Sequence, residues 1–361
     1  MNNKKILFLV PYPFDKAPSQ RLKFEQYYKY FESNGFTLTK SSFVSEAFWK
    51  VIYKKGFWLA KIFYTCTGYF RRLGILFSLR RYDIVYIHLW VTPFGPPFFE
   101  WLVCKLSRRV IYDIDDLIYI PKTGVNQLVL KIKGKNKPLF LIKKADHVIT
   151  CTPYLDEFVR KFNSNTTDIS STIDTDKYRP KQDYSIQNRK IVLGWSGSHT
   201  TVKYLYLLGS VFKMLRDQGV PFKLLVLGDK LFSVEGIETE ALEWKEHYEL
   251  KVINQFDIGL YPLPDEEWVY GKSGLKALQY MAAGIPTIAT AIGANFRIIE
   301  NGVNGFLVKT DEEWVQCIKK LVGDETLRKQ IGQRGAKVVN DRFSVRANED
   351  VYLSVLQKVI G

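Results

Sequence analysis

A glycine-rich turn opens residues 271–286, GKSGLKALQYMAAGIP, and leads into an amphipathic stretch that ends at Gly284. The first turn of a helix leaves backbone N–H groups unpaired. With the positive end of the helix dipole, these groups bind phosphate or diphosphate. Lys272 and Ser273 add a cation and a hydroxyl at the same place. The turn therefore predicts an anion site, and an ordinary helix start with glycine for tight packing is the alternative.

A second candidate site is the hydroxyl-rich segment GWSGSHTT, residues 194–201, at the end of an apolar run of buried-strand length. Open α/β sheets bind ligands at the carboxyl ends of their strands. We therefore predict ligand contacts in this segment, with a plain turn as the alternative. The residues predicted to bind are Ser196, Gly197, Ser198, His199 and Thr200.

Carboxylates crowd the segment YDIDDLIY, residues 112–119, after another apolar run. Asp113, Asp115 and Asp116 would repel one another there unless they bind sugar hydroxyls, a cation or an arginine. For Asp116, the alternatives are a structural cap or a pairing with Arg21. Arg21 ends the loop PYPFDKAPSQR at a predicted helix start. It is a candidate for acceptor or phosphate contact, weighed against a surface salt bridge.

These polar groups need elements to position them, and short apolar runs alternate with helical spacing along the chain. Helical spacing is clear over residues 20–34 and 341–360. The predicted strands are residues 5–10, 84–88, 110–112, 147–150, 191–195, 223–227, 258–261 and 287–289. Strands that alternate with helices imply parallel sheets. We therefore predict an α/β chain of two Rossmann-like, doubly wound parallel-sheet domains with a cleft between them.

The chain of 361 residues exceeds the size at which one hydrophobic core usually stops growing. The polar stretch SIQNRK precedes a fresh apolar strand, so we place the domain boundary there. The expected domains are residues 1–185 and 186–342, followed by a closing helix over 343–361.

The net charge of +15 calls for an acidic partner: nucleic acid, an anionic membrane surface or a phosphate-bearing substrate. No zinc-finger spacing, basic zipper or RNP motif is present, so we expect no nucleic-acid partner. The four cysteines form no CxxC pair, which suggests a reducing compartment. No window approaches the ~18 apolar residues of a membrane span, so any membrane contact should be peripheral.

Residues 48–81 mix Phe, Trp and Tyr with Lys and Arg, a composition typical of a helix lying on a membrane surface. Each basic residue near anionic lipid heads would contribute about 1 kcal/mol. We predict membrane contact here. The alternative is a helix pair whose aromatic face packs on the first sheet.

The run YMAAGIPTI, residues 280–288, closely resembles a motif of glycosyltransferase family 4, in which a Glu, seven residues and a second Glu precede A-M-A-A-G-x-P-V-I. Residues 256–268 and 289–308 also look like the family's usual neighbours of this motif. The resemblance extends more loosely over nearly the whole chain. It implies the GT-B fold, with the nucleotide-sugar donor in the C-terminal domain, the acceptor in the N-terminal one, and the closing helix crossing back to the first domain.

By this resemblance, the second Glu, which holds the donor ribose, corresponds to Gln279, and the first corresponds to Gly271. The turn amides that hold the diphosphate fall on Ser273, Gly274 and Leu275. The family's Arg and Lys against the diphosphate are missing from the segment 194–201. His199 would supply a hydrogen-bond donor there and Lys272 the cation. Asp115 takes the place of the family's His, so Asp115 and Lys272 are the predicted catalytic residues.

The resemblance also implies transfer with retention of configuration, no cofactor and no essential metal. A glycan or lipid-linked glycan is the implied acceptor, surface polysaccharide or lipopolysaccharide the implied product, and the cytoplasm, at the inner face of the membrane, the implied location. The departures from the motif keep open a catalytically inactive nucleotide-binding or scaffold subunit. A sugar-nucleotide epimerase, which shares the fold class but needs acid and base groups around the donor sugar, is a second alternative.

Overall fold

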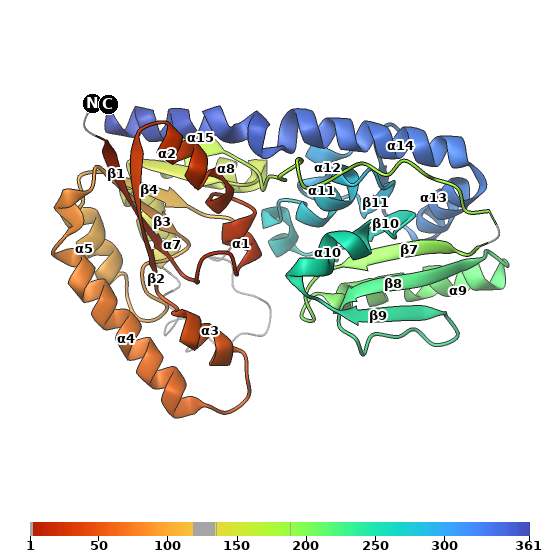
Figure 1. The fold of residues 1–361 in the computed structure, drawn as a ribbon, viewed down its shortest axis with the longest axis horizontal. Coiled ribbons are helices and arrows are strands. Elements are labelled where there is room, and N and C mark those ends of the chain that lie inside the picture. The colour runs from red at the N-terminus through yellow and green to blue at the C-terminus, as the bar shows by residue number, and fades with distance from the viewer. Residues whose placement is uncertain (1–2, 118–133, 135, 188) are drawn as a thin grey trace. The chain divides into compact units, whose positions relative to one another are not determined.

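The computed structural model describes residues 3–117, 134, 136–187 and 189–361. Within these residues the chain forms two compact units. The first unit is Met1–Ser171 with Asn348–Gly361, and the second unit is Thr172–Ala347. Each unit holds a six-stranded sheet whose described strand pairs are all parallel (Figure 1). The predicted fold class of two parallel-sheet α/β domains is confirmed.

The sheet of the first unit has the order β2-β1-β3-β4-β5-β6. Its strands are β1 (Lys4–Val10), β2 (Phe36–Ser42), β3 (Ile84–His88), β4 (Val110–Asp113), β5 (His147–Thr150) and β6 (Thr166–Asp168). Its described helices are α1 (Pro18–Arg21), η1 (Glu25–Tyr27), α2 (Tyr28–Ser33), α3 (Glu46–Ile52), α4 (Trp58–Leu76), η2 (Leu79–Arg81), α5 (Phe98–Leu106), α7 (Lys137–Lys144) and α8 (Pro153–Arg160).

The sheet of the second unit has the order β12-β11-β10-β7-β8-β9. Its strands are β7 (Ile191–Ser196), β8 (Phe222–Gly228), β9 (Thr239–Glu243), β10 (Ile258–Tyr261), β11 (Thr287–Thr290) and β12 (Phe306–Val308). Its described helices are η3 (Val202–Leu208), α9 (Gly209–Asp217), α10 (Glu246–Ile253), η4 (Glu267–Gly271), α11 (Leu275–Ala282), α12 (Asn295–Ile298), α13 (Asp311–Gly323), α14 (Glu325–Val338) and the π-helix η5 (Val339–Phe343).

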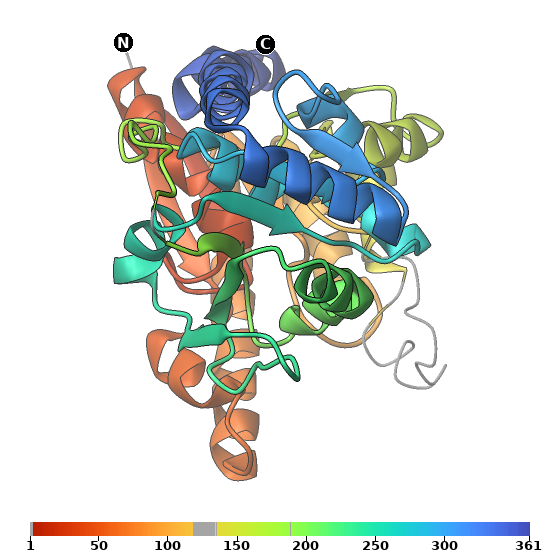
Figure 2. The ribbon, with the colours of Figure 1, turned by 90° about the vertical axis from the view of Figure 1, so that its right-hand side faces the viewer.

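Helices cover both faces of each sheet (Figures 1 and 2). Strand β7 shows why, because its successive side chains point to opposite faces. Leu193 and Trp195 belong to the hydrophobic core shared with α9 and α13, whereas Val192 belongs to the core shared with α10 and α11. A strand buried on both faces must be apolar throughout. This requirement explains why the central strands are visible in the sequence as continuous apolar runs.

The helix predicted over residues 20–34 is broken into α1, η1 and α2. Buried polar side chains explain the interruption. Gln20 Nε2 donates to the carbonyl of Tyr12 at 3.1 Å and to Glu25 Oε1 at 2.9 Å. Lys23, at 1% exposure, forms a buried ion pair with Asp113. These contacts hold the loop after β1 against the sheet, and a continuous helix would not bring all of these side chains to their partners.

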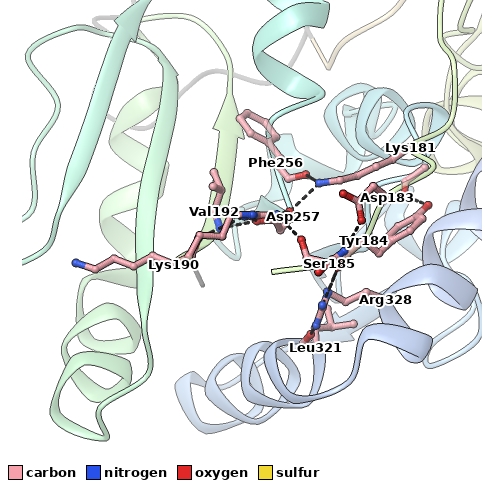
Figure 3. A network of polar contacts seen from close by, with 12 residues as sticks. Lys181, Asp183, Tyr184, Ser185, Lys190, Val192, Phe256, Asp257, Leu321 and Arg328 are labelled. Carbon is pink, nitrogen blue, oxygen red and sulfur yellow. Dashed lines mark hydrogen bonds and ion pairs between the residues drawn. The ribbon is translucent and has the colours of Figure 1, made fainter. Parts of the chain in front are cut away.

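The segment before β7 belongs to the second unit, although the sequence places the boundary after residue 185. Asp257, which immediately precedes β10, accepts hydrogen bonds from Lys181 Nζ at 2.7 Å and Arg189 Nη2 at 2.9 Å (Figure 3). Tyr184 donates its hydroxyl to the carbonyl of Gly284 at 2.7 Å. These bonds fasten residues 172–190 across the second unit. The polar composition of residues 185–190 correctly predicted a loop among the described residues of this stretch. It did not reveal that the whole segment from residue 172 packs with the second unit.

The last helix, α15 (Val345–Ile360), carries residues of both units. From Asn348 onward it packs within the first unit. Tyr352 is fully buried there, with its ring centroid 4.5 Å from that of Tyr27. The periodicity predicted for residues 341–360 is therefore real, although a π-helical turn, η5, forms its first residues.

Candidate active site

The strand order of the second sheet reverses between β7 and β10. The chain moves from β7 outward to β8 and β9, and then returns to the other side of β7 as β10, β11 and β12. Ligands of open α/β sheets bind outside the carboxyl ends of the strands at such a switch point. The segment 194–201 follows β7, and the turn that opens α11 lies beyond β10 in the chain. Both predicted binding segments therefore belong to this switch point.

Gly274 shapes the turn at the start of α11. It is the residue before the helix and has φ +76°, a left-handed conformation that glycine adopts without strain. A Cβ at this position would also collide with Ile298 Cδ1. Helix α11 runs from Leu275 to Ala282, as the sequence predicts, and Gly284, with φ +71°, follows its end. The amides of the first helical turn are thus set at the carboxyl side of the sheet.

Lys276, which the sequence analysis overlooked, brings a cation to the switch point. Its Nζ lies 5.4 Å from the ring centroid of Trp195, in β7, and 5.6 Å from that of Tyr261, in β10. Within the part of the chain that the structure describes, this ammonium makes no hydrogen bond and no ion pair. Burial, together with the nearby charge of Lys272, lowers the pKa of Lys276 to about 8. An anion placed here would gain a poorly hydrated cation.

Gly197 leaves room beside this ammonium. A Cβ built on Gly197 would lie 2.5 Å from Cη2 of Trp195 and 2.8 Å from Cε of Lys276. Both distances are shorter than real Cβ contacts allow, so only glycine fits without displacement. The absence of a side chain at Gly197 keeps the aliphatic stem of Lys276 close to the carboxyl end of β7.

Lys272, the cation predicted from the sequence, lies in the same region. Its Nζ is 5.6 Å from the ring centroid of Trp268, and the ring of Trp268 lies 5.5 Å from that of Tyr204. Tyr204 belongs to η3, directly after the hydroxyl-rich segment. This stack joins the turn of α11 to the segment that follows β7. Lys272 and Lys276 therefore supply two cations to one locality of the second unit.

The hydroxyls of the segment after β7 are arranged around the backbone of Ser198. Ser198 Oγ lies 2.8 Å from Thr200 Oγ1, and the amide of Ser198 donates to Thr201 Oγ1 at 3.1 Å. Ser198, His199 and Thr200 are exposed. Ser196 differs, because it is 1% exposed and its Oγ contacts the hydroxyl of Tyr280 at 3.2 Å. The structure therefore keeps Ser198, His199 and Thr200 accessible and turns Ser196 inward.

Gln279 lies on the buried side of α11, at 4% exposure. Its Nε2 donates to the hydroxyl of Tyr178 at 3.2 Å. Tyr178 is part of the segment that precedes β7 and was not singled out from the sequence. The side chain predicted to hold the donor ribose is thus oriented by a tyrosine, and its amide nitrogen is already engaged.

In the first unit, Asp113 is structural. It ends β4, is fully buried, pairs with Lys23 and accepts a hydrogen bond from the hydroxyl of Tyr86. His88 Nδ1 lies 3.8 Å from Asp113 Oδ1. Burial alone would raise the pKa of Asp113, but Lys23 and His88 outweigh it and lower that pKa. Of the three carboxylates in this segment, Asp113 therefore has a structural role as the partner of a buried lysine.

Asp115 and Asp116 follow β4 and are partly buried. Burial raises the pKa of Asp115, against the opposing influence of His88 and Lys23. Asp116 Oδ1 accepts a hydrogen bond from the amide of the next residue, Leu117, at 2.8 Å. Arg21 is partly buried at the end of α1. Residues 118 and 119, the end of the acidic segment, lie outside the described residues.

One feature of the sequence could have drawn attention to Lys276. This lysine is the second residue of α11, where the positive end of the helix dipole disfavours a cation by about 0.3–1 kcal/mol. A lysine at this position is therefore a candidate contact for an anionic ligand. Lys23 had a different signal, since it stands between two apolar residues, Leu22 and Phe24. No group of His, Cys, Asp and Glu among the described residues is placed to hold a metal ion.

Comparison with known families and sequences agrees with this geometry. Residues 190–324, which contain both segments of the switch point, match the family described as glycosyl transferases group 1. The chain is 25% identical over 185 residues to the capsular polysaccharide biosynthesis glycosyltransferase CapM of Staphylococcus aureus, covering 48% of this chain and 47% of CapM. It is 21% identical over 253 residues to spore coat protein SA of Bacillus subtilis, covering 60% of this chain and 66% of that protein. The chain thus spans about half to two thirds of these relatives.

Solved structures match over nearly the entire chain. A glycosyltransferase from Rickettsia africae superposes with a TM-score of 0.72 at 15% identity, covering 100% of this chain and 99% of the other. HepE from Anabaena, in complex with UDP and glucose, gives a TM-score of 0.70 at 14% identity, covering 99% and 100%. Identities this low establish the fold alone. The chain therefore has the GT-B fold, and its residues 190–324 match the family of group 1 glycosyl transferases.

Proposed function

We propose that this protein is a retaining glycosyltransferase that moves a sugar from a nucleotide-sugar donor to a glycan or lipid-linked glycan. The proposed setting is surface polysaccharide or lipopolysaccharide biosynthesis at the cytoplasmic face of a membrane. We assign the donor to the second unit and the acceptor to the first. CapM, named for capsular polysaccharide biosynthesis, and HepE, solved with UDP and glucose, support the substrate class.

One observation carries the donor site: the partly buried ammonium of Lys276 at the switch point, close to the rings of Trp195 and Tyr261. Negative charge builds on the nucleotide diphosphate as it leaves the sugar. Preorganised cations and amides in a site of low polarity stabilise such charge most effectively. Lys276, Lys272 and the amides of Ser273, Gly274 and Leu275 would share this task. Lys276 is the replacement we propose for the family cations that are missing from the segment after β7.

Asp115 is the proposed catalytic carboxylate of the first unit. Its raised pKa fits a group that exchanges a proton or a hydrogen bond with a sugar hydroxyl. Asp116 and Arg21 remain proposed contacts to the acceptor or to a phosphate. His199 and the hydroxyls of Ser198 and Thr200 would contact the donor next to Gly197, since they are exposed beside it.

The test is a binding screen of the full chain with UDP, GDP, ADP, CMP and their sugars by thermal shift and calorimetry, because a ligand of the native state raises its apparent stability. Lys276→Met should weaken binding of the preferred nucleotide by ~10-fold or more, since a charge-assisted hydrogen bond contributes ~1.5–3 kcal/mol. Lys213→Met, in which an exposed lysine of α9 is replaced, is the matched control. Equal affinity in wild type and Lys276→Met would disprove the assignment.

Turnover is then followed as nucleotide released from the preferred sugar nucleotide. Release in the presence of an acceptor supports transfer. Nucleotide binding without turnover on any donor would favour the scaffold alternative. Interconversion of donor sugars without an acceptor would favour an epimerase.

A further inference from the structure

Exposed apolar side chains form a continuous stripe along α4 of the first unit. With 3.6 residues per turn, positions 59, 62, 63, 70, 73 and 77 fall on one face of the helix, and Phe77 directly follows its last residue. The exposed fraction ranges from 40% at Leu73 to 90% at Phe77. The members of the stripe are Leu59, Ile62, Phe63, Phe70, Leu73 and Phe77.

The opposite face of α4 is fixed to the sheet, so the stripe must point outward. Arg72, at 1% exposure, donates to the carbonyls of Val10 and Val91, each at 2.9 Å, and to Ser41 Oγ at 2.9 Å. Gly68 admits the ring of Phe43, which a Cβ would meet at 2.7 Å. These contacts determine how α4 is rotated about its axis. The contacts of Arg72 and Gly68 therefore hold the apolar stripe on the solvent-facing side of α4.

Helix α5 widens the apolar surface beside α4 (Figure 1). Phe98 is 55% exposed and Trp101 is 42% exposed. Their rings stack with centroids 6.2 Å apart. Exposed apolar side chains gathered on two neighbouring helices mark a binding face. We call the stripe of α4 together with Phe98 and Trp101 the docking surface.

The charged residues of the segment that carries α4 all have one sign. Residues 47–82 contain no Asp or Glu. Lys54 and Lys55 stand exposed just before α4, and Arg80 and Arg81 stand exposed just after it. The basic residues of this segment are Lys50, Lys54, Lys55, Lys61, Arg71, Arg72, Arg80 and Arg81. A binding partner must therefore offer an apolar interior together with negative charge at both ends of α4.

We propose that the docking surface binds the face of an anionic phospholipid bilayer, with α4 lying parallel to the membrane plane. A helix of 19 residues is ~28 Å long, and its aromatic side chains would enter the boundary between headgroups and acyl chains. The basic residues at the two ends would contact lipid phosphates. Among the described residues, no helix is long and apolar enough to cross a bilayer.

The position of the docking surface suggests why it is useful. Helix α3, which precedes α4, carries Trp49, whose ring lies 5.5 Å from that of Tyr12. Tyr12 follows β1 at the carboxyl edge of the first sheet, where we place the acceptor. Docking would hold that edge near the membrane and favour an acceptor attached to lipid. This consequence rests on the proposed function, whereas the docking itself does not.

The test is flotation of the full chain with two kinds of vesicle: phosphatidylcholine alone, and phosphatidylcholine mixed with phosphatidylglycerol. No sugar donor is present, so the result is independent of transferase activity. The wild-type chain should float with the anionic vesicles, and high salt should weaken that binding. A triple variant, Phe63→Ser with Phe70→Ser and Phe77→Ser, should lose it. Because the three rings are exposed, the variant should keep its melting temperature and its nucleotide binding.

Two matched variants serve as controls. Replacing the exposed Leu207 and Leu231 of the second unit with Ser should leave flotation unchanged. Replacing Lys54, Lys55, Arg80 and Arg81 with Gln should abolish the preference for anionic vesicles, whereas Gln at Lys213, Lys230, Lys329 and Arg334 should not. The proposal is overturned if the wild-type chain fails to float. It is equally overturned if the triple variant floats normally, or if the triple variant instead abolishes self-association of the chain, which would make the surface an interface between copies.

Discussion

Gly197 and Lys276 are in such close contact that a single methyl group on the glycine would lie 2.8 Å from Cε of the lysine. The same methyl group would lie 2.5 Å from Cη2 of Trp195, a side chain that is 2% exposed and cannot easily move. The stem of Lys276 can move away from the methyl group, but the contact with Trp195 is relieved only if the backbone of residue 197 or the indole ring also shifts.

Gly197→Ala should displace the ammonium of Lys276 and weaken nucleotide binding, while overpacking lowers the free energy of unfolding by about 1–3 kcal/mol. Calorimetric titration and urea unfolding measure the two effects. Gly209→Ala is the control, because a Cβ there meets no atom within 4 Å. Unchanged nucleotide affinity in Gly197→Ala would show that the position of Lys276 is unimportant for the donor.

Donor affinity should fall as the pH rises through about 8, the pKa to which burial and Lys272 lower Lys276. Above this pH the free protein loses the ammonium and must regain a proton to bind the diphosphate. Lys276→Arg keeps its charge throughout this range, so its affinity should be flat where that of wild type declines. Parallel titrations across this pH range compare the two proteins. Identical profiles would assign the decline to another group.

Gln279→Glu should strengthen nucleotide binding if this side chain holds the ribose, because a carboxylate accepts hydrogen bonds from a diol with charge assistance. The change is nearly isosteric, so it avoids the cavity that alanine would create at a position that is 4% exposed. The hydroxyl of Tyr178 can donate to the new carboxylate. Comparing the nucleoside diphosphate with its 2′-deoxy form measures the effect. A gain that is equal for both ligands would exclude the 2′ hydroxyl as the target.

Asp115→Asn should lower kcat by ~100-fold or more, as expected for loss of an acid or base group, and leave nucleotide affinity unchanged. Nucleotide release under saturating donor measures kcat, and calorimetry measures affinity. Asp116→Asn is the matched comparison, because Asp116 accepts a hydrogen bond from the amide of Leu117. If both variants turn over like wild type, this segment plays no part in the chemistry.

Asp113→Asn should destabilise the protein by about 3–5 kcal/mol, because it leaves the charge of Lys23 buried without its partner. The lowered pKa of Asp113 gives a second signature. Its stabilising contribution is present above the unfolded-state pKa of about 3.9 and is lost as the pH falls through the lower folded-state pKa. Urea unfolding of Asp113→Asn, of Lys23→Met and of the double variant measures the coupling between the two groups. Additive losses would mean that the two groups do not interact.

All eight strands predicted from apolar runs are present, and three of them, β3, β5 and β10, have the predicted bounds. The four strands that were missed are β2, β6, β9 and β12, and these are the outer strands of the two sheets. An outer strand is covered on fewer sides, so its sequence need not be apolar. FTLTKSS and TEALE, for example, have exposed residues along their length. The sequence therefore reveals the interior of a sheet better than its edges.

The candidate site shows the same limit. The turn before α11 could be predicted because glycine spacing and the start of a helix are local features. Lys276 could not be assigned in the same way, since its meaning depends on Trp195 and Tyr261, which lie far from it in the sequence. The role of Asp113 was hidden for a similar reason, because its partner Lys23 lies 90 residues away. The role of a charged side chain depends on the residues around it in the folded structure, and the spacing of apolar residues in the sequence does not reveal those neighbours.

The fastening of residues 172–190 to Asp257 determines where this protein can be divided. A fragment that begins at residue 186 would lack Lys181 and Tyr184, leaving Asp257 with fewer cations and Arg328 without the carbonyl of Tyr184 that it contacts at 2.7 Å. A fragment that begins at Thr172 retains the whole network. Exchange of the second unit between related proteins, natural or engineered, should therefore succeed at the earlier junction, with residues 172–190 transferred together with that unit.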